Sequence, residues 1–526
     1  PEESAPAIEG VLGNDDDPED DPLTAILVSG PSQALGFTFR EDGTFIYTPN
    51  PGYSGPDSFD YKVNDGSGDS ITVSAAITVV GGISGRVFED IDGNLLAGAE
   101  AIGDADNPIV AGATVQVYAD DGTIPDAPDA ADSPIAGSPF TTGPSGLFTT
   151  GSLADGKYWA VVDSKTVPAS QELAEPQANI WAEQTYGWIG SLCADGAGGT
   201  GGPAAGNGCY GGRRAGQSDD LTAWHSGAEH IASVIISGGF AVPNVDFGFS
   251  FNTVSNTLAG DARDDDGGAA GRIVQGSLRQ FMTNANALAG ANAMRFVPTE
   301  PTNATGDGGN WWRVDVTAAL PPLTDADTTI DGTAYELTGA VRNDNPGAVG
   351  TGGNVGVDGI PLAQVPRSEL QIDGSGLVII DDGAGMIPHR TTVRALSITE
   401  AGAQAIRVNN ISQVAPVADD IVLEDLIIGM PPVWQPQTLP TGTSTGIHLN
   451  ATNRAVLRDS FIGWTNGRTI NVETSTNATI TGSEFRDTNE DVIDIYESSN
   501  GTLFERNRVS GGLNWAIDIT VSSNTT

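Results

Sequence analysis

Four copies of one short pattern, apolar–polar–apolar, lie between residues 447 and 519: IHL (447–449), INV (470–472), IDI (493–495) and IDI (517–519). Successive copies are 23, 23 and 24 residues apart. Two more apolar columns follow the same spacing, one formed by Leu457, Ile480 and Leu503 and the other by Ile462, Phe485 and Val509. A repeat of this length holds three short strands but not two helices, so it predicts the stacked coils of a right-handed parallel β-helix.

Asparagines mark one predicted turn of these coils. Asn477, Asn500 and Asn524 each follow an isoleucine of the first column by seven residues. Asparagine tolerates left-handed backbone angles and its amide can bond along a stack, so we expect the three side chains to lie above one another. The proline-rich segment 429–446 interrupts the pattern and is predicted to protrude as a loop.

The charge balance restricts the partners of the chain. It has 23 basic and 68 acidic residues, a formal net charge of −45, which makes nucleic acid and anionic membranes poor partners. Divalent metal, calcium above all, is the natural complement of so many carboxylates. The sequence contains no run of 18 apolar residues, so it predicts no membrane-spanning helix. The chain opens without a signal peptide and stops seven residues after Ile519, so we interpret it as a segment of a longer protein.

Residues 1–80 predict a small β-sandwich. Apolar residues alternate at 37–39, 45–47, 59–63 and 71–73, and Asp-Gly pairs at 42–43 and 65–66 indicate hairpin turns. The strings VLGNDDDP (11–18), DGTFIYTPN (42–50), GYSGPDSF (52–59) and YKVNDG (61–66) resemble the cadherin-like repeats of giant bacterial surface proteins. That resemblance implies calcium at an acidic edge, with the expected ligands Asp15, Asp17, Glu19 and Asp57. An acidic loop without metal is the alternative.

Residues 81–250 predict a second β-sandwich. The strings GRVFEDIDGN (85–94) and VAGATVQVY (110–118) resemble the start of the prealbumin-like, calcium-binding B-type domains of staphylococcal surface adhesins. Oxygen atoms at alternate positions can surround one ion, and the expected calcium ligands are Asp90, Asp92, Asn94, the Leu96 carbonyl and Glu100. Gly98 stands where that family has an acidic residue, and an ordinary Asp-Gly turn is the alternative.

Within this unit, residues 168–243 are interpreted as an insertion that carries both cysteines. Cys193 and Cys209 flank a glycine-rich loop, and in a chain of extracellular character they most simply form one disulfide bond. Zinc bound with the help of His225 and His230 is the alternative, although no Cys-x-x-Cys spacing is present.

Residues 251–526 are assigned to the β-helix. Ser277 can cap a helix whose apolar face holds Leu278, Phe281 and Met282, and the strings GSLRQF (276–281) and MRF (294–296) resemble the N-terminal helix of secreted β-helix proteins. Such a helix would cover the first coil, whose strand edges would otherwise recruit other chains. Residues 335–368 interrupt the first rungs with a glycine-rich excursion. At the other end, Ile517, Ile519 and Val521 would leave apolar core facing water, so we expect further coils of the polypeptide, or a neighbouring subunit, to cover them.

One column of polar residues is predicted to face outward from the coils: His448, Asn471, Asp494 and Asp518. Adjacent carboxylates in such a column could bind calcium or share a proton, and polysaccharide lyases and pectin-degrading hydrolases use β-helices. No basic residue stands in the column, and the closest candidates are Arg458 and Arg486 in other columns, so catalysis is not favoured.

The sequence as a whole therefore predicts a structural or adhesive segment of a large, calcium-stabilised protein of the extracellular cell surface. Its expected partners are other copies of itself, or surface polysaccharide or protein. A polysaccharide lyase or glycoside hydrolase is one alternative function, and a repeating subunit of a surface layer or filament is another.

Overall fold

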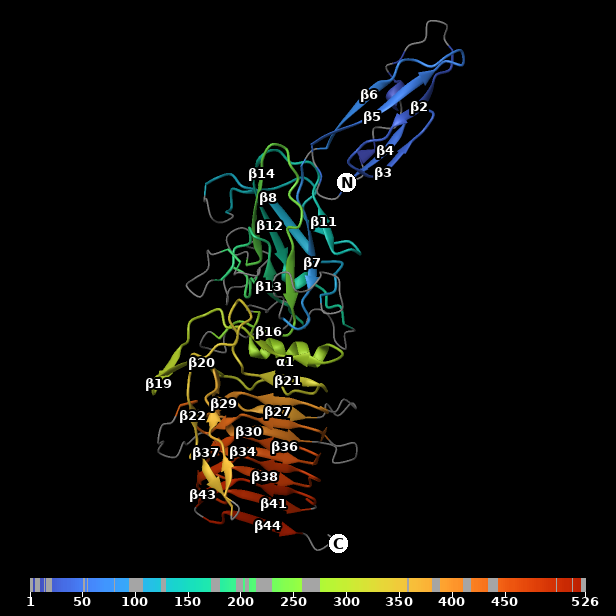
Figure 1. The fold of residues 1–526 in the computed structure, drawn as a ribbon. Coiled ribbons are helices and arrows are strands. Elements are labelled where there is room, and N and C mark those ends of the chain that lie inside the picture. The colour runs from blue at the N-terminus through green and yellow to red at the C-terminus, as the bar shows by residue number, and fades with distance from the viewer. Residues whose placement is uncertain are drawn as a thin grey trace.

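A computed structural model describes residues 3–4, 10–13, 15, 21–50, 53, 55–79, 81–93, 107–123, 129–171, 180–194, 202–203, 208–213, 229–257, 275–356, 359–380, 388–409, 418–433, 443–497, 499–512 and 514–521. The fold is almost entirely β: two sandwiches are followed by a parallel β-helix that begins with one helix (Figure 1). The three units follow one another along the length of the molecule (Figure 1). None of the helices in the described ranges has the length and apolar character to cross a membrane.

The first unit consists of two three-stranded sheets, β1-β4-β3 and β2-β5-β6. Its strands are β1 (Glu3–Ser4), β2 (Thr24–Ser29), β3 (Ala34–Phe39), β4 (Phe45–Pro49), β5 (Gly55–Asn64) and β6 (Val73–Val79), and a short 3₁₀ helix, η1, spans Gly10–Leu12. Tyr47, Phe59 and Tyr61 form the centre of its core. Both predicted Asp-Gly turns join antiparallel strands. The last predicted strand starts later than expected, because Ile71 lies outside β6 and is 83% exposed.

The second unit packs the sheet β10-β8-β12-β14, with β9 beside β8, against the sheet β11-β7-β15-β13. Its elements are β7 (Ser84–Glu89), β8 (Thr114–Ala119), β9 (Ser133–Pro134), β10 (Phe140–Thr141), β11 (Leu147–Thr149), β12 (Gly156–Asp163), the 3₁₀ helix η2 (Ser164–Thr166), β13 (Glu183–Gly187), β14 (Ile231–Ile236) and β15 (Phe247–Ser250). The interpretation of 168–243 as an insertion is wrong in part. β13 and β14 lie inside that range, yet they pair with β15 and β12 as integral strands.

The joint between the sandwich and the β-helix is built around α1 (Leu278–Ala287). Ser277 caps the helix as predicted, since its side chain accepts a hydrogen bond from Gln280 N–H. Phe281 and Met282 lie in the core of the β-helix, whereas Leu288, directly after the helix, packs into the core of the sandwich. β16 (Thr253–Val254) also crosses the joint, because it pairs in parallel with β18 (Arg295–Phe296).

Three parallel sheets form the β-helix, and each full coil contributes one strand to each. Sheet 1 contains β17 (Asn292–Ala293), β21 (Thr328–Asp331), β28 (Thr392–Arg394), β32 (Val422–Glu424), β36 (Val456–Arg458), β39 (Thr479–Thr481) and β42 (Leu503–Glu505). Sheet 2 contains β19 (Ala304–Gly306), which is antiparallel, β20 (Gly309–Asp315), β26 (Leu370–Asp373), β29 (Leu396–Thr399), β33 (Ile427–Ile428), β37 (Phe461–Gly463), β40 (Glu484–Thr488) and β43 (Arg508–Gly512). Sheet 3 contains β27 (Leu377–Ile380), β30 (Gly402–Asn409), β34 (Thr443–Asn450), β38 (Ile470–Glu473), β41 (Ile493–Glu497) and β44 (Ile517–Val521).

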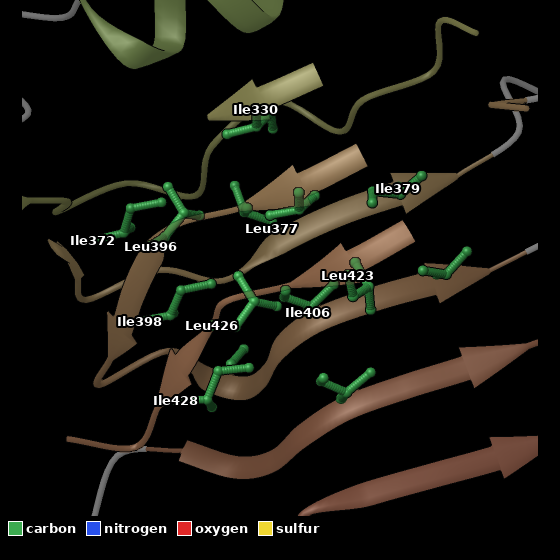
Figure 2. Packing of buried hydrophobic residues seen from close by; sticks show 14 of the residues in the cluster. Ile330, Ile372, Leu377, Ile379, Leu396, Ile398, Ile406, Leu423, Leu426 and Ile428 are labelled. Atoms are coloured by element: carbon green, nitrogen blue, oxygen red, sulfur yellow. The ribbon is translucent and has the colours of Figure 1, made fainter. Parts of the chain in front are cut away.

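The apolar columns fill the interior of the coils, as Figure 2 shows for the upper coils. The register confirms two predicted columns, the one that starts at Ile447 and the one that starts at Ile462. The third predicted column, which starts at Leu457, is wrong at its last residue. Ile480 pairs with Phe504, while Leu503 pairs with Thr479 and is 49% exposed. The extra residue of the 24-residue step therefore lies before β42 and shifts the strand by one position.

Residues with left-handed backbone angles stack at the corners of the coils. At the corner before sheet 1 they are Asp327, Arg390, Asp420, Arg454, Asn477 and Gly501, whose φ values lie between 55° and 69°. The predicted asparagine stack is therefore wrong. Asn477 holds the left-handed position, but in the next coil Gly501 holds it, and Asn500 pairs with Thr476. Asn524 lies outside the described residues.

The predicted excursion 335–368 is confirmed, and it folds back onto sheet 2 (Figure 1). It forms two small antiparallel pairs, β22 (Ala348–Val349) with β25 (Val365–Pro366), and β23 (Gly353–Val355) with β24 (Ile360–Leu362). One more short pair, β31 (Ala418–Asp419) with β35 (Thr452–Asn453), links neighbouring coils. Of the predicted loop 429–446, Met430 and Val433 are buried, whereas 434–442 lie outside the described residues.

Candidate functional site on the outer face of sheet 3

The predicted outward column forms on sheet 3, and it has one more member than the sequence indicated. Asn471 pairs with His448 on one side and with Asp494 on the other, and Asp494 pairs with Asp518. Arg407 pairs with His448 and extends the column upward. The repeat spacing did not reveal Arg407, because the connection between β30 and β34 makes the step from Arg407 to His448 longer than the regular repeat. The local pattern was visible, since Ile406-Arg407-Val408 is also apolar–polar–apolar.

Basic residues are therefore closer to the column than Arg458 and Arg486, the predicted candidates. Arg407 stands in the column itself, and Arg468 lies at the corner before β38. The Nε atom of Arg468 is 2.8 Å from Asp494 Oδ2, and its Nη1 atom is 3.8 Å from Glu490 Oε2. The expectation that no basic residue serves the column is wrong.

A second set of side chains on the same face forms a hydrogen-bonded network. Glu473 Oε2 is 2.9 Å from His448 Nε2 and accepts a hydrogen bond of 2.9 Å from the Tyr496 hydroxyl. The Tyr496 oxygen in turn accepts a hydrogen bond of 3.3 Å from Asn471 Nδ2. Side chains from three successive coils thus fix one another's positions.

Two amide oxygens on this face lack a donor among the described residues: Asn471 Oδ1 and Asn450 Oδ1. Asn471 is only 7% exposed and Asn450 only 9%. Buried polar groups are nearly always hydrogen-bonded in folded proteins, so two such oxygens on one face are informative.

The environment of Asp494 raises the pKa of its carboxyl group above the usual value of 3.8. Burial is the main cause, Arg468 opposes it, and the charges of Asp518, Asp491 and Glu490 add to it. Asp494 therefore holds a proton more readily than an ordinary aspartate does.

The calcium ligands predicted in the first unit are found in different surroundings. Five donors surround the Asp57 carboxylate at 2.9–3.2 Å: Ser32 N–H, the Ser32 hydroxyl, Gln33 N–H, Ser58 N–H and the Tyr47 hydroxyl. Burial acts to raise the pKa of Asp57, but the backbone donors outweigh it and hold the pKa below its usual range. Because the lone pairs are used in this way, we assign Asp57 a structural role instead of a metal-binding one.

Asp15 keeps a potential ligand atom. Its Oδ2 atom is buried and has no hydrogen-bond donor within the described ranges. Its charge contributes, after burial, to raising the pKa of Tyr61. Asp17 and Glu19 lie outside the described residues.

The predicted calcium loop of the second unit lies at the joint with the β-helix. Asp90 is fully buried, and the Gly93 carbonyl accepts a 2.9 Å hydrogen bond from the Tyr210 hydroxyl. Burial raises the pKa of Tyr210, Asp90 and Asp92 raise it further, and Arg295 of the β-helix opposes them. Asn94, Leu96 and Glu100 lie outside the described residues.

A further acidic group was not predicted. Carboxylate oxygens of Asp120, Asp121 and Asp132 lie within 4.8 Å of one another. Both oxygens of Asp132 accept backbone hydrogen bonds, from Asp121 N–H and Asp129 N–H at 2.9 and 2.8 Å. Asp132 therefore holds the ends of this loop together.

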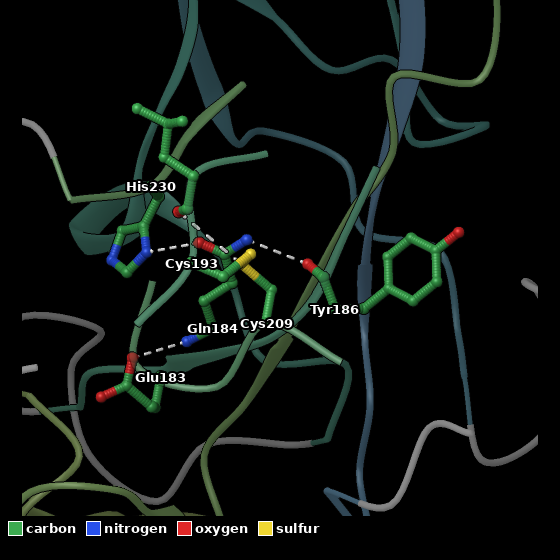
Figure 3. The surroundings of a disulfide bond; sticks show 7 residues. Glu183, Gln184, Tyr186, Cys193, Cys209 and His230 are labelled. Carbon is green, nitrogen blue, oxygen red and sulfur yellow. Dashed lines mark hydrogen bonds between the residues drawn. A yellow bond between two sulfur atoms is a disulfide. The ribbon is translucent and has the colours of Figure 1, made fainter. Parts of the chain in front are cut away.

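Cys193 and Cys209 form the predicted disulfide bond, with Cα atoms 5.1 Å apart (Figure 3). Zinc bound by these two thiolates is thereby excluded. Beside the bond, Gln184 Nε2 donates to the Tyr186 carbonyl, which orients the amide so that Gln184 Oε1 faces His230 Nδ1 at 2.9 Å (Figure 3). Gln275 Nε2 reaches the other ring nitrogen. His230 is therefore a buried histidine whose two ring nitrogens both contact glutamine side chains, whereas His225 lies outside the described residues.

Comparisons with known proteins give one family match that is located in the chain. No curated protein matches the chain. Among solved structures, a group B streptococcus pilus 2b backbone protein is 15% identical, with 29% of this chain and 66% of that chain aligned; the TM-score of 0.13 is too low to support an argument about the fold. The aligned part thus spans slightly less than two thirds of the pilus protein. Residues 1–79 match the family described as bacterial Ig domain, so the chain begins with a bacterial Ig-like domain.

Proposed function

We propose that this chain is a non-catalytic structural segment of a large bacterial cell-surface protein. In it, the two sandwich domains act as a spacer that holds the β-helix away from the point at which the sandwiches are attached. The bacterial Ig-like domain at residues 1–79 supports a surface location. The cadherin-like and B-type resemblances of the first two units agree with it. The arrangement of the three units one after another along the molecule suits a spacer (Figure 1).

The observation that carries this proposal is the joint between the second sandwich and the β-helix. Asn284 of α1 accepts a 3.0 Å hydrogen bond from Trp181 N–H, and its Nδ2 donates to the Trp181 and Phe251 carbonyls at 2.9 and 2.8 Å. Ser255 donates to Glu183 Oε2 at 2.7 Å nearby. All five residues are buried, so the two units share a packed interface instead of a free linker. A shared interface transmits orientation from one unit to the next, as a scaffold requires.

Labelling of intact cells tests the location. Antibodies raised against residues 275–521 should bind unpermeabilised cells that express the native protein, and external protease should remove the signal. An antibody against a cytoplasmic protein provides the control for cell integrity. Labelling that appears only after permeabilisation would refute the proposal.

Calcium is the second part of the proposal. We infer that it binds at the acidic edge that includes Asp15 and at the loop that includes Asp90 and Asp92. A buried Asp15 oxygen without a donor among the described residues supports the first site, and the presence of Asp90 and Asp92 in one loop supports the second. Asp57 is not part of the proposed set.

Chelation provides the measurement. A ligand that binds only the folded state stabilises it by about 2.7 kcal/mol at a hundredfold excess over its dissociation constant, so removing calcium should lower the melting temperature of the two sandwiches. Re-addition of calcium, but not of magnesium, should restore it. An unchanged melting temperature and unchanged protease resistance of residues 1–120 would contradict calcium binding.

A further inference from the structure

We propose that the cleft between the first and the second unit binds a lysine side chain on an extended segment of a partner protein. The cleft has a volume of about 570 Å³ and is lined by residues of both sandwiches. Boundaries between domains are a common place for binding sites of this size. The proposal names a partner chemistry for the surface role proposed above, and it rests on that role for where the partner is met.

The first argument is a buried carboxylate that a ligand can reach. Asp246, which directly precedes β15, lines the cleft and is only 6% exposed. Its Oδ1 atom accepts a 2.7 Å hydrogen bond from Arg86 N–H, whereas Oδ2 has no donor among the described residues. Oδ2 does not belong to the fully enclosed oxygen atoms of the described chain, so it is open to the cleft. A buried charge of this kind needs a counter-charge.

The second argument is that the chain does not supply this counter-charge itself. Among the described residues that line the cleft, Arg86 is the other charged one. Its side chain is exposed to water, and within the described ranges no ion pair joins it to Asp246. Burial therefore raises the pKa of Asp246, although the backbone and the charge of Arg86 oppose it. The formal net charge of −45 also favours a cationic partner.

The carboxylate is held in place before a ligand arrives. The Asp246 carbonyl accepts a hydrogen bond from Trp188 N–H at 3.1 Å, and Val245 N–H donates to the Ser84 carbonyl at 3.0 Å. Gly85 packs so closely against Val245 that a Cβ atom at Gly85 would lie 1.9 Å from the Val245 carbonyl oxygen. β7 therefore fixes the residues before β15, so binding would cost little further ordering of the site.

The walls of the cleft suit the stem of a long basic side chain. Leu35 of the first unit and Leu147 and Pro243 of the second line the cleft. Leu35 is 67% exposed and Leu147 40%. Basic side chains lay their aliphatic stems along apolar surface and direct the charged group to a polar partner, which here is Asp246.

The state of the carboxylate favours lysine over arginine. A guanidinium group binds a carboxylate best through both oxygen atoms at once. Oδ1 of Asp246 already accepts from Arg86 N–H, so Oδ2 is the oxygen atom that remains for a ligand. The compact ammonium group of lysine needs a single oxygen atom of this kind.

Edge strands favour a peptide over a free amine. β3 is an end strand of the sheet β1-β4-β3, and β11 is an end strand of the sheet β11-β7-β15-β13, as far as the sheets are described. Leu35 belongs to β3, and Leu147 and Thr149 belong to β11, so both edges border the cleft. An extended segment can add its backbone to such an edge while one of its side chains enters a pocket.

The test is binding of short peptides to the full chain, followed by calorimetry or ligand-observed NMR. The probes are acetylated and amidated tripeptides with alanine on both sides of lysine, arginine or norleucine, together with n-butylamine. Norleucine has the apolar stem of lysine without its charge. We expect the lysine peptide to bind at least about tenfold more tightly than the norleucine peptide, and more tightly than the arginine peptide and n-butylamine.

Three variants locate the binding. Asp246→Asn keeps the size of the side chain and an oxygen atom for Arg86 N–H, and it should weaken binding of the lysine peptide at least about tenfold without lowering the melting temperature. Leu35→Gln, at an exposed wall position of the first unit, should also weaken binding because both units form the cleft. Glu41→Gln removes an exposed carboxylate that does not line the cleft, and it should bind as the parent does.

Equal binding of the lysine and norleucine peptides, or equal binding by Asp246→Asn, would overturn the proposal. So would a similar loss in Glu41→Gln, which would show attraction by net charge alone. Binding of n-butylamine as tightly as the lysine peptide would identify a free amine as the ligand, and tighter binding of the arginine peptide would contradict the assignment to lysine. Surface labelling of cells does not depend on this cleft, so failure here leaves the proposed location intact.

Discussion

Sheets 2 and 3 of the β-helix are built from the same coils, yet their outer faces differ in composition and in what covers them. The outward column of sheet 2 runs through Ile427, Phe461, Glu484 and Arg508, and the excursion 335–368 lies along it. Val349 and Val365 pack on Ile427 and Phe461. The column of sheet 3, by contrast, is polar throughout from Arg407 to Asp518.

The lower contacts of the excursion are polar and equally specific. Thr351 donates from its backbone and its hydroxyl to Glu484 at 2.5 and 2.6 Å, and Arg508 donates to the Gly352 carbonyl at 2.6 Å. The inward columns of both sheets are apolar, so they decide that coils form. The outward columns decide what each face contacts, and they vary without disturbing the coil.

The largest expected effect comes from removing the side chain of Phe461, which packs between the excursion 335–368 and sheet 2. Its side chain is fully buried between the excursion and sheet 2. Phe461→Ala should lower the free energy of unfolding by about 3–5 kcal/mol, because it removes buried apolar surface and leaves a cavity. Denaturant unfolding measures the loss. Phe240→Ala, at a position 61% exposed, should change stability by no more than about 0.5 kcal/mol, and equal losses for the two variants would contradict the assignment.

The next effect separates the excursion from the coils it covers. Glu484→Gln replaces one carboxylate oxygen by an N–H donor facing Thr351, which itself donates. We expect a loss of about 1–3 kcal/mol and faster hydrogen exchange over residues 346–367, while the inward strands stay protected. Glu505→Gln on the exposed side of sheet 1 should leave exchange unchanged. Unchanged exchange in Glu484→Gln would show that the apolar contacts alone hold the excursion.

The two faces also show what sequence can and cannot predict. Inward columns were predictable because burial imposes apolar residues at a fixed spacing, and the columns from Ile447 and Ile462 hold throughout. The third column failed at Leu503 because spacing alone does not locate an inserted residue. The asparagine stack failed for a related reason: a left-handed corner accepts Asp, Arg, Asn and Gly alike, so residue identity does not mark it.

Outer contacts were harder to predict. The sequence indicated the column His448, Asn471, Asp494 and Asp518, because strand alternation places those residues outward. It did not indicate Arg407, which a long connection separates from β34, or Arg468, which reaches Asp494 from a corner. Nor did it show that Asp57 is surrounded by donors from Ser32, Gln33 and Tyr47, since those contacts join distant strands.

The smallest expected effect concerns the outer face of sheet 3 and the pH dependence of the stability of the chain. The pKa of Asp494 is raised in the folded chain, so the folded state binds the proton more tightly than the unfolded state does. At neutral pH the carboxyl is ionised in both states, and its burial then disfavours the folded one. As pH falls through the raised pKa the folded chain takes up the proton first, and the penalty disappears below the ordinary value of 3.8.

Asp494→Asn should therefore raise the melting temperature slightly at pH 7, and the gain over the parent should shrink as pH falls toward 4. Asp518→Asn sharpens the result, because removing a neighbouring negative charge should recover part of the same gain. If Asp494→Asn is instead less stable at neutral pH, the ion pair with Arg468 outweighs burial. The outer face of sheet 3 would then be held together by ion pairs. Its contrast with the covered outer face of sheet 2 would be smaller than the buried amide oxygens indicate.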